Sequence, residues 1–186
     1  GSQVGGEMYQ NSLLAIGLSL FLMMIYVAFR FRMKLAVGAV VSLVHDVLFT
    51  VGAFAIFGFP FDLTVLAAVL ALIGYSLNDT IVIFDRVREN FGKLRKADAI
   101  EIVDISLTET LRRTIMTVGT VLVVVVAMLW LGGPALRWFS VAMMIGLFAG
   151  TYSSIYIATS YALMMGLDKE DFIEKPKSEL VEETFD

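Results

Sequence analysis

The segment GYSLNDT at residues 74–80 lies inside an apolar run that extends from Leu63 to Phe84. Lipid cannot solvate an amide or a carboxylate, and a charged side chain at the centre of a bilayer costs about 2.5–3.5 kcal/mol or more. Asn78 and Asp79 therefore need a partner, a wet cavity or a functional role. Either this polar pair hydrogen-bonds neighbouring helices and fixes their register, or it forms a functional site.

The composition around this segment is that of a membrane protein. The sequence of 186 residues is 58% hydrophobic and 17% charged, whereas soluble domains are about 45–50% apolar and about 25% charged. Apolar runs of the roughly 20 residues needed to cross a bilayer recur along it. We predict an all-α fold, a polytopic integral membrane bundle of five transmembrane helices.

The spans are separated by short polar turns or charged segments. A charged stretch from Gly92 to Thr108 is expected to hold an amphipathic helix. The capping-box spacing of Asp98 with Glu101, and of Ser106 with Glu109, predicts two helix starts, the second opening the fourth span. The predicted spans are Asn11–Phe29, Leu35–Phe57, Leu63–Phe84, Leu107–Trp130 and Trp138–Met165.

Lysine and arginine predict the orientation. Thirteen of the fourteen lie in the loop after the first span, in Arg86–Arg113 or after Asp168, and only Arg137 lies on the other side. By the positive-inside rule these segments, and the C-terminus, face the cytoplasm. An N-terminus outside suggests that an earlier span precedes this chain.

Three regions follow from this topology. Residues 1–10 are interpreted as a tag scar at Gly1-Ser2 with an extramembrane lead-in, and residues 11–166 as the transmembrane domain, including a cytoplasmic segment at 85–108. Residues 167–186, with eight acids and three lysines from Asp168 onward, are expected to be a disordered cytoplasmic tail.

Two helix faces bring intramembrane polar residues to the same depth. Tyr75, Asn78, Asp79, Val82 and Arg86 share one helical face. On the fourth span Arg113, Thr117 and Thr120 have the same kind of spacing. Because an arginine at this depth needs an acid or water, we expect Asp79 to contact Arg113 directly or through water, either as a proton site or as a static salt bridge. Alternatively, Arg113 pairs with Glu109 or reaches the cytoplasmic interface.

A second polar pair, His45 and Asp46, lies near the middle of the second span. Histidine titrates near neutrality and suits a proton relay, but adjacent helical residues point about 100° apart, so Asp46 is not expected to orient the imidazole ring. An enzyme active site built on this pair would lack a nucleophile and a set of metal-binding residues. With no cysteine, one histidine and no phosphate-binding loop, we expect no enzymatic activity, metal or cofactor.

Small residues recur every fourth position down the fifth span. This spacing lets another helix approach closely and predicts a packing seam. Its members are Gly146, Gly150, Ser154, Ala158 and Ala162.

Several of these segments together resemble the SecF subunits of the bacterial SecDF protein-export complex, a branch of the resistance–nodulation–division superfamily. The resemblance spans nearly all of Val4–Gly166. It rests most strongly on GYSLNDTIVIFDRVREN at residues 74–90, with VHD at 44–46, FDLT at 61–64, SLTETLRRT at 106–114, LGGP at 131–134 and GTYSSIYIA at 150–158.

The resemblance implies a multi-pass subunit of the bacterial inner membrane that pairs with SecD. Together they would assist the SecYEG channel and its associated subunits, using the proton-motive force to draw unfolded preproteins across the membrane. The subunit would also contact membrane lipid, and no nucleic acid is expected as a partner. It also implies roles in proton conduction for Asp79 and Arg113, to which the sequence adds Asn78, Thr117, His45 and Asp46 as candidates.

The family also has an earlier helix and a folded external domain that this sequence lacks, so we expect a fragment limited to the transmembrane region. The alternative function is a scaffold that transports nothing and only docks SecD to the SecYEG channel. Whether Asp79 changes its protonation state distinguishes the two functions.

Overall fold

The computed structural model describes residues 2–94 and 96–172, and within them it is a bundle of long helices without strands. Five helical segments are long and apolar enough to cross a membrane, which confirms the predicted fold class. The elements are α1 (Ser2–Arg30), α2 (Met33–Phe57), α3 (Leu63–Lys93), α4 (Ala99–Leu131), α5 (Gly133–Tyr152), the π-helical turn η1 (Ser153–Ile157), α6 (Ala158–Met164) and the 3-10 turn η2 (Lys169–Asp171).

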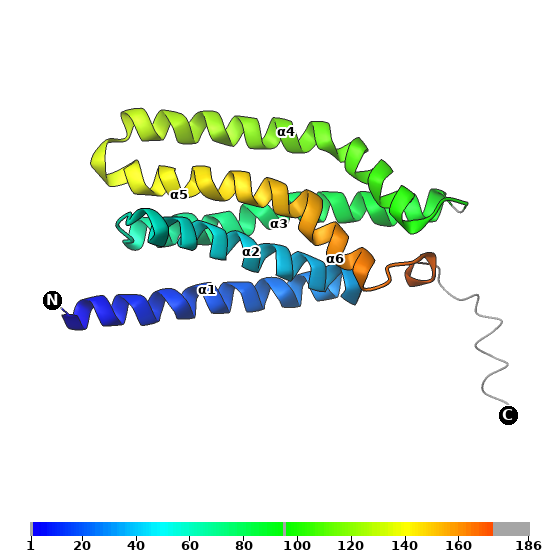
Figure 1. The fold of residues 1–186 in the computed structure, drawn as a ribbon, viewed down its shortest axis with the longest axis horizontal. Coiled ribbons are helices and arrows are strands. Elements are labelled where there is room, and N and C mark those ends of the chain that lie inside the picture. Colours follow the sequence, from blue (N-terminus) through cyan, green and yellow to red (C-terminus); the bar gives the residue numbers. More distant parts are fainter. Residues whose placement is uncertain (1, 95, 173–186) are drawn as a thin grey trace, which may run out of the picture.

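The helices lie side by side and alternate in direction (Figure 1). The α1–α2 turn, the α3–α4 connection and the segment after α6 lie at one end of the bundle, and the α2–α3 and α4–α5 turns lie at the other. Many of the lysines and arginines lie in the first set of connections or at the helix ends that border them. The end with these connections is called the basic end below.

The turns at the opposite end follow from their sequences. Gly58 ends α2 with a φ of 65°, a left-handed conformation that favours glycine. Asp62 then caps α3, because its Oδ1 accepts hydrogen bonds from the amides of Thr64 (2.9 Å) and Val65 (3.0 Å) and from the Thr64 hydroxyl (2.6 Å). Gly133, at a φ of 69°, performs the same reversal between α4 and α5.

One predicted helix boundary is wrong. Helix α4 runs without a break from Ala99 to Leu131, so no separate helix precedes the fourth span and none starts at Leu107. Ser106 lies inside the helix, where its hydroxyl donates to the Ile102 carbonyl (2.6 Å) and accepts from Asn90 Nδ2 of α3 (3.0 Å). The capping-box spacing also fits a helix interior, and here a contact between helices uses the hydroxyl. Asp98 does occupy the N-cap position, although its side chain makes no capping hydrogen bond.

The fifth span is a continuous path through α5, η1 and α6, and its small residues are buried. A Cβ atom added at Gly146 would collide with the Leu72 side chain of α3. At Gly150 it would lie 3.2 Å from Ser76 Oγ and 3.4 Å from Asp46 Oδ2. Further along the span, Ala158 is fully buried and its carbonyl lies against Gly38 of α2.

The two ends of the chain differ from the simple regions drawn from the sequence. Helix α1 already begins at Ser2, within the stretch interpreted as a lead-in. Residues 167–172 are ordered: Leu167 is buried, and Phe172 stacks on Phe91 with ring centroids 4.6 Å apart. The expected disorder of the acidic tail otherwise concerns residues 173–186, which lie outside the described residues.

A lysine of α2 holds the segment 167–172. Lys34 Nζ donates to the Gly166 carbonyl and to Asp171 Oδ2, both at 2.8 Å. Burial raises the pKa of the Asp171 carboxyl, but the hydrogen bond from Lys34 and that from the Asp168 amide outweigh it, so this pKa lies below its usual value.

Candidate intramembrane polar site

Asp79 lies on the side of α3 that faces α4 and is only 4% exposed. On α4, Thr117 and the positive charge of Arg113 influence its carboxyl group. Among the described residues, no ion pair within 4 Å joins Asp79 to Arg113, so the direct form of the predicted contact is not formed and the two charges interact over a longer distance. A contact through water stays a prediction. The carboxylate is thus buried beside a positive charge without being locked to it.

The polar surroundings of Asp79 are incompletely bonded. The Thr117 hydroxyl shares its proton between two carbonyls of its own helix, those of Arg113 and Thr114, each at 3.0 Å. The Tyr75 hydroxyl is buried and has no hydrogen-bond partner of standard geometry within the described chain. Buried polar groups are normally paired with protein or water, so this site suits water or a mobile proton.

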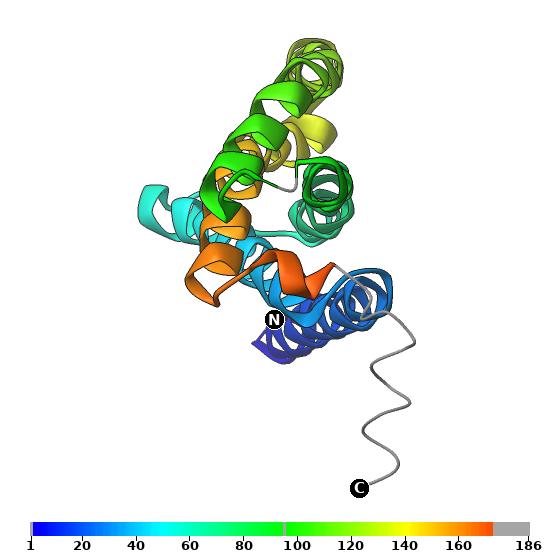
Figure 2. The same cartoon turned by 90° about the vertical axis from the view of Figure 1, so that its right-hand side faces the viewer.

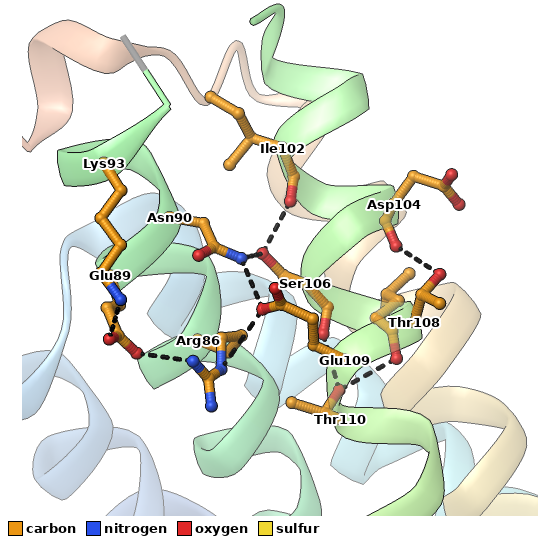
Figure 3. Close-up of polar contacts among 11 residues, drawn as sticks. Arg86, Glu89, Asn90, Lys93, Ile102, Asp104, Ser106, Thr108, Glu109 and Thr110 are labelled. Carbon is orange, nitrogen blue, oxygen red and sulfur yellow. Dashed lines mark hydrogen bonds and ion pairs between the residues drawn. The ribbon is translucent and has the colours of Figure 1, made fainter.

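Arg113 does not pair with Glu109, the local alternative drawn from the sequence. Glu109 turns toward α3, where its Oε2 accepts from Asn90 Nδ2 at 3.0 Å and lies 3.5 Å from Arg86 Nε (Figure 3). Arg86 also binds Glu89 at 3.0 Å. This network at the basic end joins α3 to α4 and leaves Arg113 to interact with Asp79.

Asn78 is not brought together with Asp79. The sequence places both residues on one broad helical face, but in the structure Asn78 is exposed whereas Asp79 is buried. Adjacent residues project about 100° apart on a helix. Tyr75 and Asp79, four positions apart, follow the face that packs on α4, and so does Arg86, which contacts Glu109.

Asp46 forms a second buried polar site on the α2 side of α3. It is 3% exposed, and its Oδ2 accepts a hydrogen bond of 2.6 Å from Ser76 Oγ. Its Oδ1 lies 3.2 Å from His45 Nδ1, so the expectation that Asp46 cannot orient this ring is wrong. Although the two Cβ atoms point about 100° apart, the side chains of His45 and Asp46 still approach each other along the surface of α2.

Hydroxyl groups extend this second site to η1. Thr80 and Ser154 share a hydrogen bond of 3.0 Å, and Ser42 donates to Ser153 at 2.9 Å. Sequence spacing did not single out Ser76, which binds Asp46, or Thr80, whose hydroxyl donates to the Ser76 carbonyl at 3.1 Å. The sequence does contain a pattern that could have identified them, because small hydroxyl residues four positions apart in an apolar helix typically hydrogen-bond a neighbouring helix. The π-helical turn at Ser153–Ile157 had no such signal.

Neither site has the composition of a metal centre. The described residues contain no group of three or more His, Asp or Glu side chains able to hold a metal ion. The two acids Asp79 and Asp46 instead lie on different flanks of α3, each among hydroxyl groups. Such an arrangement can bind and release protons or stabilise helix contacts.

Comparisons with known proteins agree with this architecture. The family model described as "Protein export membrane protein SecD/SecF, C-terminal" matches residues 1–168. The protein translocase subunit SecF of Pseudomonas aeruginosa is 50% identical over 183 residues, which cover 98% of this chain and 60% of that protein. The corresponding subunit of Vibrio alginolyticus is 48% identical over 170 residues, or 91% and 54% of the two chains. The chain thus spans a little over half the length of these curated relatives.

A solved structure shows the same fold. The crystal structure of SecDF from Thermus thermophilus, described as a translocon-associated membrane protein, superposes with a TM-score of 0.83 at 40% identity. The superposition covers 89% of this chain and 23% of that one.

Proposed function

Since the chain belongs to the SecD/SecF C-terminal family of protein-export membrane proteins, we propose that it is a membrane subunit which couples the proton-motive force to preprotein translocation. Its partner would be SecD, and the pair would act with the SecYEG channel and its associated subunits on unfolded preproteins. In this role the chain transports protons and carries out no enzymatic reaction. Asp79 is the proposed proton-binding group, and Arg113 controls its charge.

The observation that carries this proposal is that Asp79 is buried near Arg113 but makes no direct contact with it. A static salt bridge between α3 and α4 would require a direct contact between the carboxylate and the guanidinium, and breaking a buried pair of this kind is costly. Asp79 is buried without such a contact, yet it remains within the electrostatic influence of Arg113. A small movement of α4 would change that influence, and with it the protonation of Asp79.

The second candidate function, a scaffold that only docks SecD, has support from the outer surface of α4. Arg113 is exposed, and Met116, three positions further on the same face of α4, is 61% exposed. A partner helix on this surface would cover apolar side chains and Arg113 together. Docking there is compatible with both functions, so the surface alone does not distinguish them.

The orientation is part of the same proposal. The basic end faces the cytoplasm of a bacterium, with the C-terminus on that side of the inner membrane. A cysteine introduced at Ala135 should react with a membrane-impermeant thiol reagent in intact cells, and one at Gly92 should not. The reverse pattern would contradict the orientation.

The function is tested by Asp79→Asn in the complete export complex. This change removes the titrating group but keeps the shape, so we expect complexes to assemble normally and proton-driven export to be lost. Asp85→Asn is the matched control: it makes the same chemical change on the same helix, at a half-exposed acid that binds Arg30 at 2.8 Å. If Asp79→Asn lowers the yield of complex and leaves export per complex unchanged, the scaffold is the correct function.

A further inference from the structure

A small pocket of about 260 Å³ lies at the basic end, outside both intramembrane sites. It is formed where the α1–α2 turn, the end of α3 and the segment after α6 meet. Figure 2 looks onto this end and shows the segment after α6 turning back across the bundle. The pocket is lined by Phe29, Arg30, Phe31, Arg32, Arg88 and Phe172.

Three arginines and no acid line this pocket, and they are not equally engaged. Arg30 binds Asp85 at 2.8 Å and lies over the Phe31 ring at 5.0 Å. Among the described residues, neither Arg32 nor Arg88 forms an ion pair. Both side chains are exposed, so two guanidinium groups are available to an anion.

The neighbouring acids do not neutralise them, because Asp85 is already bound to Arg30. Asp171 interacts with Arg32 electrostatically, but its carboxylate is bound by Lys34 at 2.8 Å. The pocket therefore keeps an excess of positive charge. Guanidinium groups bind phosphate oxygens through two parallel hydrogen bonds, a geometry that favours phosphate over a simple point charge.

The position and the walls of the pocket match a lipid headgroup. The first membrane-crossing helix ends at Arg30, so the pocket lies at the level where headgroups meet the end of the hydrophobic span. Phe29 is 88% exposed beside the arginines and offers an apolar surface to the first part of an acyl chain. The volume corresponds to roughly nine water molecules, which suits a phosphate with its glycerol rather than a complete lipid.

We propose that this pocket binds the phosphate of an anionic phospholipid, held by Arg32 and Arg88 with Phe29 against the acyl chains. The bound lipid joins the α1–α2 turn to α3 at the basic end. This site is independent of Asp79 and of proton transport. It selects anionic over zwitterionic lipid because the latter brings its own positive charge to the arginines.

The test uses the full chain in nanodiscs that contain phosphatidylglycerol and phosphatidylcholine at about one to four. All variants are studied in this mixture, so that the surface charge of the membrane is the same for each. Native mass spectrometry of the released protein counts the retained lipid. The wild-type chain should retain phosphatidylglycerol selectively. Arg32→Gln combined with Arg88→Gln should weaken this retention about 30-fold, the loss expected when two basic side chains stop attracting an anionic lipid.

The matched control is Lys93→Gln combined with Lys96→Gln, which removes two exposed charges beside the α3–α4 connection of the same basic end, away from the pocket. It should retain phosphatidylglycerol within about twofold of the wild-type chain. Equal loss of phosphatidylglycerol in the two double variants would show only general electrostatic attraction and would overturn the proposal. A wild-type chain that retains both lipids without selectivity would overturn it too. A thermal scan of each variant separates lost binding from lost folding, and Arg32→Lys with Arg88→Lys, which keeps the charge, should fold and bind with intermediate strength.

Soluble phosphate is the other source of the same chemistry. Glycerol 3-phosphate added to the wild-type chain in detergent should displace little phosphatidylglycerol, because it lacks the acyl chains that contact Phe29. Complete displacement at equimolar amounts would assign the pocket to a soluble phosphate compound and contradict the lipid site.

Discussion

Gly38 provides the sharpest test of how the bundle is packed. This residue of α2 is buried against the fifth span, and a Cβ atom added there would collide with the backbone carbonyl of Ala158. The same atom would lie 3.5 Å from the Ala162 amide nitrogen. Because these neighbours are backbone atoms of α6, they cannot move aside as a flexible side chain does. Gly38→Ala therefore has to push α2 and α6 apart.

The size of the effect follows from two opposing terms. Adding a methyl group to a tightly packed contact costs about 1–3 kcal/mol, whereas replacing glycine by alanine inside a helix returns about 1 kcal/mol. The net loss for Gly38→Ala is then about 1 kcal/mol at the middle of the range. Gly52→Ala in the same helix is the matched control: a Cβ there meets no atom within 4 Å, so this variant should gain about 1 kcal/mol.

Differential scanning fluorimetry of Trp130 and Trp138 in detergent measures the difference. About 2 kcal/mol between the two variants corresponds to roughly 4–8 °C in a chain of this size, with Gly38→Ala below and Gly52→Ala above the wild-type melting temperature. Equal melting temperatures for the two alanine variants would refute the close approach of α2 to α6.

Two further predictions concern hydrogen bonds near the two ends of α3. Asp62→Ala should lower stability by about 1 kcal/mol at neutral pH through the loss of the helix cap. The Thr64 hydroxyl and the other capping hydrogen bonds hold the pKa of the Asp62 carboxyl below the usual value of 3.8. The stabilisation is therefore present above pH 3.8 and lost as the pH falls through the lower folded-state pKa, where the melting temperatures of wild type and Asp62→Ala should converge. Asn90→Ala should cost roughly 1–3 kcal/mol, because it removes the buried amide that binds Ser106 and Glu109; a wild-type melting temperature would exclude this network as a link between α3 and α4.

The long apolar runs predicted the five spans well because each must cross a bilayer, and their turns carry glycine, proline or basic residues. The beginning of α4 was harder. The charged stretch from Gly92 to Thr108 suggested a separate surface helix, whereas Ser106 lies inside one continuous helix and binds Asn90 of α3. Local capping patterns contain no information about such a partner.

The polar sites were likewise predicted only in part from the sequence. Sequence spacing identified Asp79, Arg113 and Asp46 as unusual residues for a membrane interior, and Asp79 and Asp46 are indeed buried. It did not predict that Glu109 turns away from Arg113, that Asn78 is exposed, or that Asp46 binds Ser76. These outcomes depend on which neighbouring helix each face meets, and periodicity along one helix does not specify that.

The most direct test of the proposed proton site is the protonation state of Asp79 itself. Isotope-edited infrared spectroscopy of the complete complex, with Asp79→Asn to assign the carboxyl band, follows this group between about pH 5 and about pH 9. A proton site should gain and lose the protonated carboxyl band across this range, and Arg113→Lys should shift the transition because a lysine ammonium does not reproduce the guanidinium geometry. An Asp79 that stays in one protonation state throughout, in a complex that still exports protein with the proton-motive force, would contradict its assignment as the proton-binding group.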